Sequence, residues 1–261
     1  MRVLVTGASR GIGRAICLRL AQQGCQVVAC ASAHADELDQ VAHEAQRHGG
    51  QVITLIGDLS DPATPAKLVA SALCSLGGLD AVVSNAGVSR PSTLAELALK
   101  DWDYLFAVNT RAPWLLAKAA YPVLRESRGS FVSVASMSGV QPYPGMGAYS
   151  PSKAAVLMLV RTLAQEWAAD GIRVNAVSPG LIHTSLTARV YADAPTKAAR
   201  EALVPLHRIG TPDADIAGIV SFLIAQDAGF ITGQNILADG GLMDAVHGLI
   251  PGRPATERAN P

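Results

Sequence analysis

Short apolar runs alternate with longer amphipathic stretches along almost the whole chain. Each run holds three to five residues rich in valine, isoleucine and alanine, a composition typical of strands buried on both faces of a parallel sheet. The seven runs span residues 3–5, 27–31, 52–56, 81–83, 131–134, 174–177 and 236–238. The pattern therefore predicts seven strands.

The stretches between these runs place apolar residues three and four positions apart, which predicts helices with one buried face. Gly24, Gly49 and Gly171 stand where such helices would end, and glycine is favoured there because it adopts the left-handed conformation without strain. The predicted helices span residues 11–24, 36–49, 62–76, 101–125, 147–170 and 213–226.

This alternation predicts an α/β fold, with a single Rossmann-type domain over residues 1–250. Right-handed crossovers would wind its helices onto both faces of a doubly wound parallel sheet of about seven strands. Residues 181–207 break the alternation, with Pro195 and Pro205 interrupting a weak helical pattern, and are expected to form a substrate lid. The proline-rich tail, residues 251–261, is expected to fray.

Composition and charge narrow the class of protein. Hydrophobic residues make up 49% of the chain, and Lys plus Arg equal Asp plus Glu at 21 each. We therefore expect neither nucleic acid nor a membrane as partner. The apolar start is too short for a signal peptide, which predicts a cytoplasmic protein. The six histidines and the cysteines Cys17, Cys25, Cys30 and Cys74 show no metal-ligand spacing, so we expect no metal site, solvated histidines and buried thiols.

A glycine-rich segment, TGASRGIG at residues 6–13, joins the first predicted strand to the first predicted helix. Gly7, Gly11 and Gly13 would let the backbone turn tightly and bring helix N-terminal amides against a pyrophosphate. The placement between strand and helix is what makes the glycine spacing informative, and it predicts a dinucleotide site.

The end of the second predicted strand bears on which dinucleotide binds. A carboxylate there would hydrogen-bond the adenosine ribose and repel a 2′-phosphate, but no acidic residue occurs before Asp36. Arg10 could instead pair with that phosphate and Ser32 could hydrogen-bond it, which favours NADP(H) over NAD(H). Arg10 could also be a solvated loop residue. Asp58, after the third strand, is the expected partner of the adenine amino group.

Tyr149 and Lys153 are four residues apart, so both project from one face at the start of a predicted helix. Pro151 between them is tolerated only in a first turn, which places Tyr149 at the helix start. An ammonium at about 4 Å contributes about 4 kcal/mol at an effective dielectric near 20, enough to lower a tyrosine pKa by about three units. The pair could thus work as an acid and base near pH 7, although this spacing also arises by chance.

Taken together, the motifs resemble the short-chain dehydrogenase/reductase family from Arg2 to about Leu242. The resemblance rests on the glycine loop, on Asn85-Ala86-Gly87, on Ser136 thirteen residues before Tyr149, on Tyr149-Ser150-Pro151-Ser152-Lys153, and on Pro179-Gly180 with Thr184. Asn109 stands in a matching helical context, and Thr232-Gly233-Gln234 with Asp239-Gly240-Gly241 match the closing strand. Ser138 is the rival for the catalytic serine, but its spacing to Tyr149 is off the family pattern.

The resemblance implies a role for each catalytic residue. Tyr149 exchanges a proton with the substrate oxygen, Ser136 polarises the carbonyl, Lys153 lowers the tyrosine pKa and binds ribose, and Asn109 holds a relay water. The implied cofactor-binding set is Gly7, Ser9, Arg10, Gly11, Ile12, Gly13, Ser32, Asp58, Leu59, Asn85, Ala86, Gly87, Tyr149, Lys153, Pro179, Gly180, Ile182 and Thr184. His183, beside Thr184, is a candidate for facing the substrate.

The implied activity is hydride transfer between NADP(H) and a small ketone or secondary alcohol, in the direction of carbonyl reduction. Ketoacyl-carrier-protein reductases look closest, but Asp170 stands where those enzymes often carry a basic residue, which favours a free small molecule as substrate. A non-catalytic NADP-binding sensor or scaffold is the alternative. The family also implies a homotetramer built through residues 101–125, residues 147–170, the last strand and the helix before it, with Trp114 and Trp167 in an interface or the core.

Overall fold

A single seven-stranded parallel sheet organises the computed structural model, which describes residues 1–249. The strand order is β3-β2-β1-β4-β5-β6-β7, so the predicted doubly wound α/β fold is confirmed. The strands are β1 (Arg2–Thr6), β2 (Gln26–Ala31), β3 (Gln51–Ile56), β4 (Ala81–Ser84), β5 (Ser130–Val134), β6 (Arg173–Pro179) and β7 (Asn235–Ala238).

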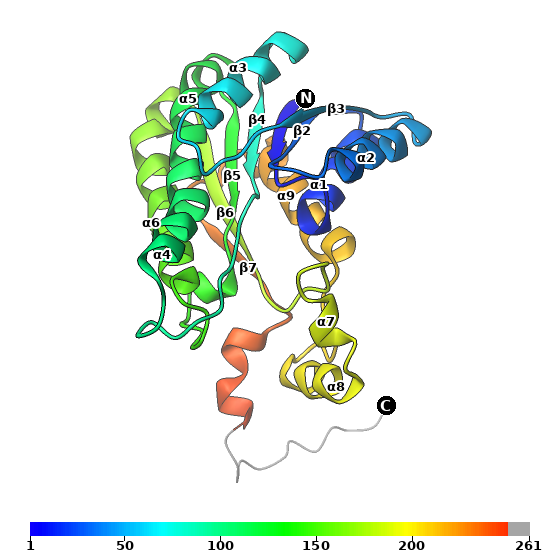
Figure 1. Cartoon of the computed structure of the whole chain (residues 1–261). Helices are drawn as coiled ribbons and strands as arrows, with labels where there is room; N and C mark the ends of the chain where they lie inside the picture. The colour runs from blue at the N-terminus through cyan, green and yellow to red at the C-terminus, as the bar shows by residue number, and fades with distance from the viewer. Residues whose placement is uncertain (250–261) are drawn as a thin grey trace.

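Two helical layers cover the sheet, as Figure 1 shows. One contains α1 (Gly11–Gln22), α2 (Ala35–Arg47) and α9 (Gly218–Ile224), and the other contains α3 (Thr64–Leu76), α5 (Ala112–Ser127) and α6 (Tyr149–Trp167). Successive side chains of β1 serve the two layers alternately, since Val3 and Val5 pack in the first core and Leu4 in the second. Both faces of the central strands are therefore apolar, which explains their unbroken hydrophobic runs.

The site is fixed by the point where the strand order reverses. β1 and β4 are neighbours in the sheet, yet the chain leaves them toward opposite layers. The glycine loop follows β1, and residues 85–87 follow β4, so the two loops meet at the same carboxyl edge. In open α/β sheets this crevice is where ligands bind.

Two of the predicted helices each contain or follow a π-helical segment. The helix expected over residues 101–125 consists of α4 (Leu99–Phe106), a π-helical segment η1 (Ala107–Arg111), and α5. A second π-helical segment, η4 (Pro212–Ala217), precedes α9. Hydrophobic spacing does not reveal such segments because a single wide turn shifts it by only one position.

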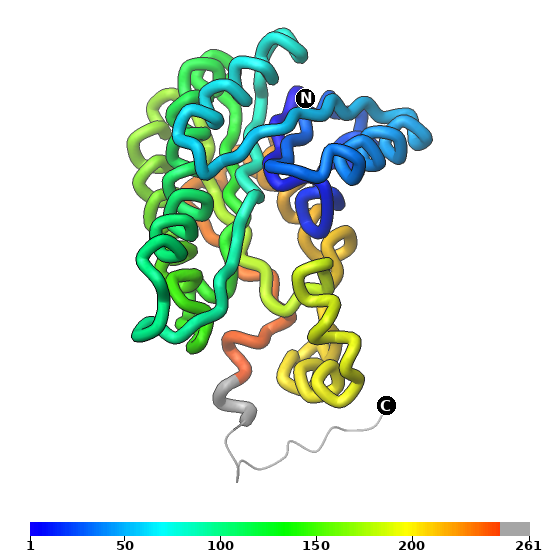
Figure 2. Tube along the Cα trace, in the orientation of Figure 1, coloured from blue at the N-terminus to red at the C-terminus, as the bar shows by residue number. Residues whose placement is uncertain are grey.

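The expected lid, residues 181–207, holds more helix than its sequence suggested. It contains α7 (Ala188–Tyr191) and α8 (Ala194–Leu203), and Pro195 begins α8 rather than interrupting it. Asp193 caps α8 by accepting a hydrogen bond from the Thr196 amide at 2.9 Å. The segment projects beyond the sheet, and Figure 2 traces it in yellow, near the start of the C-terminal η6 (Leu242–Leu249). The tail expected to fray lies outside the described residues.

The remaining short helices are η2 (Met137–Gly139), η3 (Ala168–Asp170) and η5 (Gln226–Ala228). The three predicted capping glycines all have left-handed backbones, with φ between 76° and 79°. One expectation about the cysteines is wrong: three are buried, but Cys74 is exposed on α3. Across residues 1–249, no helix has the length and apolar character needed to cross a membrane.

Candidate active site

The glycine loop is shaped by contacts too close for any side chain. A Cβ added at Gly7 would lie 2.7 Å from the Ala86 Cα, and one at Gly13 would collide with the Gly7 carbonyl oxygen. Gly7 and Gly11 also have positive φ angles of 65° and 56°. The loop therefore brings bare backbone to the N-terminus of α1, a cradle of the kind that binds pyrophosphate.

Hydrogen bonds between the ends of β1 and β4 hold this loop in place. The Asn85 side-chain amide donates to the carbonyl oxygens of Thr6 and Gly7, each at 3.0 Å. The Thr6 hydroxyl in turn accepts from the backbone amides of Asn85 and Ala86, at 3.1 and 3.2 Å. Asn85, predicted as a cofactor residue, thus works first as a support for the loop.

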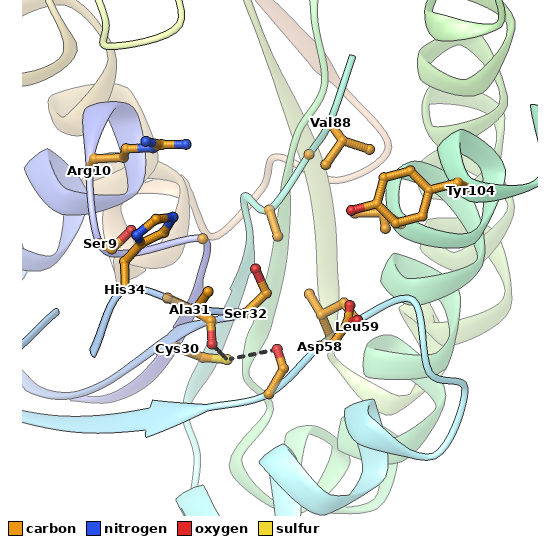
Figure 3. Close-up of a pocket in the computed structure, with 16 residues that line it drawn as sticks. Ser9, Arg10, Cys30, Ala31, Ser32, His34, Asp58, Leu59, Val88 and Tyr104 are labelled. Carbon is orange, nitrogen blue, oxygen red and sulfur yellow. Dashed lines mark hydrogen bonds between the residues drawn. The ribbon is translucent and has the colours of Figure 1, made fainter. Parts of the chain in front are cut away.

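A pocket opens beside the loop, and Figure 3 shows its lining. Eight of the predicted cofactor residues line it: Gly7, Ser9, Arg10, Ser32, Asp58, Leu59, Ala86 and Gly87. Residues that sequence reasoning did not assign also line it, namely Cys30, Ala31, Ala33, His34, Gly57, Val88, Tyr104 and Val108. Their signal was weak because most are small or apolar, and the fold alone gathers them. The other predicted cofactor residues lie outside this lining.

The floor of the pocket is the carboxyl end of β2. The Cys30 thiol lies 3.8 Å from the Ala31 carbonyl oxygen and 3.9 Å from that of Gly57, and burial raises its pKa to about 12. The thiol therefore stays neutral. Asp58 accepts hydrogen bonds from the amide and hydroxyl of Ser60, both at 2.9 Å. Arg10 and Ser32 line the same pocket, and β2 ends without a carboxylate.

Lys153 is the buried cation of the site. Its side chain is 4% exposed, and its ammonium donates to the Val134 carbonyl oxygen at 3.0 Å. Burial lowers its pKa to about 8, so it is still mostly charged at pH 7. An ammonium has three hydrogens, and this is its one hydrogen bond among the described residues, which leaves donors for a ribose.

Gly87 lies between the pocket and the ammonium. A Cβ at this position would lie 3.2 Å from the Lys153 Nζ and 3.5 Å from the Asn109 Oδ1. Any larger residue would cover both polar atoms. The bare backbone of Gly87 thus lets Lys153 and Asn109 approach the pocket that Gly87 itself lines.

Tyr149 begins α6, as its spacing to Pro151 predicted. Its ring is half-buried, with the Lys153 Nζ 5.9 Å from the ring centre. Burial raises the Tyr149 pKa above its usual value, and hydrogen bonding with Ser136 opposes this. The expected lowering by Lys153 is not found, because desolvation of the phenolate outweighs the other effects in the protein alone.

Ser136 follows β5 and occupies the N-terminal cap of η2. Its hydroxyl accepts from the Ser138 amide at 3.1 Å and also interacts with Tyr149. Ser138 is buried one turn further on and is not among the groups acting on the tyrosine. Of these two serines, Ser136 is thus the one that acts on the pKa of Tyr149.

Asn109 lies in the π-helical η1 and links three elements. Its amide nitrogen donates to the Val88 carbonyl oxygen at 2.9 Å and to the Ser152 hydroxyl at 3.0 Å, while its oxygen accepts from the Val88 amide at 2.8 Å. Ser152 donates in turn to the Tyr149 carbonyl oxygen at 2.7 Å. Both hydrogens of the Asn109 amide are thus occupied, and this side chain fixes the turn that carries Tyr149.

The predicted residues after β6 lie across the glycine loop from the pocket. A Cβ at Gly11 would lie 3.5 Å from the Thr184 Cβ, so Thr184 packs against the loop. Gly180 donates its amide to Ala238 at 2.9 Å, and Ile182 forms a bridge to Gly210. His183 is exposed, and its ring stacks on Tyr191 at 5.5 Å between centroids.

Comparisons with known proteins identify the family of this chain. A family model described as enoyl-(acyl carrier protein) reductase matches residues 7–243. The chain is 38% identical to dehydrogenase/reductase SDR family member 4 of Pongo abelii over 240 residues, which cover 91% of this chain and 86% of that protein. It is 35% identical to 3-oxoacyl-[acyl-carrier-protein] reductase FabG of Thermotoga maritima, covering 92% and 96% of the two chains. The chain belongs to the short-chain dehydrogenase/reductase family.

Solved structures place it in the same family. A short-chain type dehydrogenase/reductase from Mycobacterium marinum superposes with a TM-score of 0.85 at 33% identity, covering 92% of this chain and 94% of that one. A protein from Agrobacterium tumefaciens assigned as 2-deoxy-d-gluconate 3-dehydrogenase, solved with bound NADP, gives 0.84 at 33%, covering 93% and 96%. The fold is thus that of a hydride-transfer oxidoreductase.

The buried ammonium should cost stability, and Lys153→Met should recover it. Moving the lysine pKa from 10.5 to about 8 corresponds to about 3 kcal/mol, and loss of the Val134 hydrogen bond offsets about 1 kcal/mol. We expect the variant to be about 2 kcal/mol more stable at pH 7. Between pH 8 and 10.5 the unfolded chain keeps the proton that the folded wild type releases, so wild-type stability rises and the difference shrinks.

Denaturant unfolding at pH 7, 9 and 10.5 measures this difference. The exposed Lys67 on α3 provides a matched control, and Lys67→Met should leave stability within about 0.5 kcal/mol. A Lys153→Met protein less stable than wild type at pH 7 would show that the buried ammonium does not destabilise the folded state.

Proposed function

We propose that the protein transfers hydride between NADP(H) and a small ketone or secondary alcohol, and that it works as a carbonyl reductase. The observation that carries this proposal is the convergence of Tyr149, Lys153 and Ser136 at the carboxyl edge of the sheet, next to a glycine cradle suited to a pyrophosphate. The cofactor would supply the hydride. The protein supplies the proton, the orientation of the carbonyl and the exclusion of water.

The proton would come from Tyr149. Because burial raises its pKa, the phenol is neutral at pH 7 and has a proton to donate, as carbonyl reduction requires. Ser136, in contact with the phenol, is placed to hydrogen-bond the same substrate oxygen. Lys153 would hold the ribose with its remaining donors and stabilise the phenolate left behind, and Asn109 would anchor the relay of protons from solvent.

The cofactor would be NADP(H) rather than NAD(H). β2 ends in Ala31 with no carboxylate to repel a 2′-phosphate, and Arg10 and Ser32 line the pocket beside it. The NADP-bound relative from Agrobacterium tumefaciens supports this choice. Asp58 and Leu59 line the part of the pocket suited to adenine.

A free, largely apolar molecule is the proposed substrate. Residues 137–149, which lead from η2 to Tyr149, contain no charged side chain and expose Val140 and Tyr143, while the proposed lid exposes Leu186. An acidic carrier protein is not favoured, because Asp170 stands where carrier-dependent relatives often have a basic residue; it accepts a hydrogen bond from Tyr121 at 2.6 Å and pairs with Arg125 at 3.3 Å, so this position adds no positive charge.

We also propose a homotetramer. The outer face of α5 and α6 exposes Trp114 and Met158, 44% and 58% respectively. Helix α9 and the loop that leads from η5 to β7 expose Phe222 and Phe230. Trp167 lies in the core. Two separate apolar faces suit an assembly with two kinds of two-fold interface.

A ketone panel with NADPH tests the activity, and Tyr149→Phe tests the mechanism. Wild type should oxidise NADPH with apolar ketones faster than with sugar ketones. Tyr149→Phe should lower kcat by about 10²-fold or more and leave NADPH affinity within about twofold, because only the proton donor is lost. No turnover across the panel, with normal NADPH binding, would favour the sensor or scaffold. Undiminished turnover by the variant would exclude Tyr149 as the acid.

Cofactor choice is measured as the ratio of kcat/KM for NADPH to that for NADH with one ketone. A partly exposed charge-assisted contact contributes about 1.5 to 3 kcal/mol, so the ratio should be about 10 to 100. Arg10→Ala should bring it down toward unity, and Ala31→Asp should favour NADH. Arg47→Ala, at the far end of α2, should leave it unchanged. A wild-type preference for NADH would overturn the assignment.

Light scattering at micromolar concentration checks the assembly. We expect about 108 kDa, four times the 27.0 kDa chain. Phe230→Asp, at a fully exposed position that no monomer core needs, should give a dimer of about 54 kDa. A 27.0 kDa wild-type monomer would rule the tetramer out.

A further inference from the structure

We propose that His34 is a second, titratable cation of the 2′-phosphate site, so that the preference for the phosphorylated cofactor weakens as pH rises. The inference rests on the proposed use of NADP(H) and adds a specificity residue to it. His34 connects β2 to α2 and was expected to be an ordinary solvated histidine.

His34 lines the pocket and has an unusual backbone conformation. Its φ and ψ are 60° and 55°, a left-handed conformation uncommon for a residue with a side chain. Such conformations persist where the surrounding structure enforces them, and they gather at ligand sites. The side chain is 55% exposed, so a ligand can reach it.

Arg10 and His34 come from different loops but line the same pocket. Figure 3 shows the imidazole of His34 on the same side of the pocket as the guanidinium of Arg10, with Ser9 beside it. Ser32, two residues before His34, completes this end. Two cations and two hydroxyls around one end of a pocket suit a dianionic phosphate.

The charges around His34 explain why its protonation matters. Glu37 places a carboxylate oxygen 3.9 Å from the imidazole Nδ1, and Asp36 precedes it in the first turn of α2. Asp58 lines the pocket further along, and Arg10 is the other cation. A protonated imidazole screens a phosphate from Glu37 and Asp36. A neutral one leaves the phosphate with Arg10 alone against these carboxylates.

An imidazole changes charge between about pH 5 and 8, whereas a guanidinium stays charged throughout. The phosphate also titrates, near pH 6, but it does so equally for every variant of the protein. The ratio of wild-type to variant affinity therefore isolates the contribution of His34. That ratio should be large at pH 6.5 and small at pH 8.5.

Calorimetric titration with adenosine 2′,5′-bisphosphate and with adenosine 5′-monophosphate measures this without turnover. At pH 6.5, His34→Gln should weaken bisphosphate binding about three- to tenfold, while monophosphate binding stays within about twofold. At pH 8.5 the effect on the bisphosphate should fall below about twofold. His48→Gln, at the exposed C-terminal end of the same helix, is the matched control and should change neither ligand.

Two further measurements guard against a merely structural effect. His34→Asn should repeat the result, because asparagine tolerates the left-handed backbone, and its unfolding midpoint should match wild type. In NMR spectra of wild type, the bisphosphate should move the titration of the His34 ring to higher pH, and the monophosphate should not.

The outcomes separate the two proposals. Equal wild-type affinity for bisphosphate and monophosphate at pH 6.5 would overturn the NADP(H) assignment itself. A preference for the bisphosphate that His34→Gln and His34→Asn leave intact, or reduce equally at both pH values, would overturn the role of His34 and leave Arg10 as the specificity residue.

Discussion

The near-contact between the loops after β1 and β4 is the constraint on which the site depends. A parallel sheet brings the carboxyl ends of neighbouring strands together, and here Gly7 and Ala86 are so close that no side chain fits between them. The hydrogen bonds between Thr6 and Asn85 lock this approach. Gly87 then follows, lining the pocket with bare backbone beside the buried Lys153 and Asn109.

The buried lysine joins a helix to the sheet. Lys153 lies on α6, and its ammonium donates to a backbone carbonyl of β5. This one hydrogen bond partly offsets the free-energy cost of removing the charge from water. The π-helical turn at Asn109 ties the same region together, since its side chain joins the β4 loop to the first turn of α6. The geometry of the site thus comes from contacts between the helical layer and the sheet. The two partners of each contact are far apart in the sequence, so a local stretch of sequence contains only one of them.

Much of the fold was predictable because the strands are buried on both faces and the helices on one. The runs that became β1, β2 and β5 differ from their observed bounds by only a few residues. The π-helical turn at 107–111 was not predictable from hydrophobic spacing, and the Val88 carbonyl that its Asn109 binds lies 21 residues away in the sequence. The helix content of the lid was underestimated because the Asp193 cap makes Pro195 part of a helix start rather than a break.

The candidate site divides along the same line. The sequence alone identifies Tyr149, Lys153, Ser136 and the loop glycines, because they stand at characteristic separations along the chain. The pocket lining, which includes Cys30, Tyr104 and His34, has no such spacing, because five separate segments contribute a few residues each and meet only in the fold. The direction of the Tyr149 pKa was also out of reach, because a sequence shows the neighbouring ammonium but not the depth of burial that outweighs it.

The two opposed pKa shifts have one cause and suit one direction of chemistry. Burial disfavours charge, so it raises the pKa of Tyr149 and lowers that of Lys153 to about 8. At pH 7 the site therefore holds a neutral phenol beside a cation, the protonation state that a proton donor needs. Alcohol oxidation requires the phenolate instead, and a positive nicotinamide ring nearby would favour it. The protein alone therefore holds the protonation state that the proposed carbonyl reduction requires.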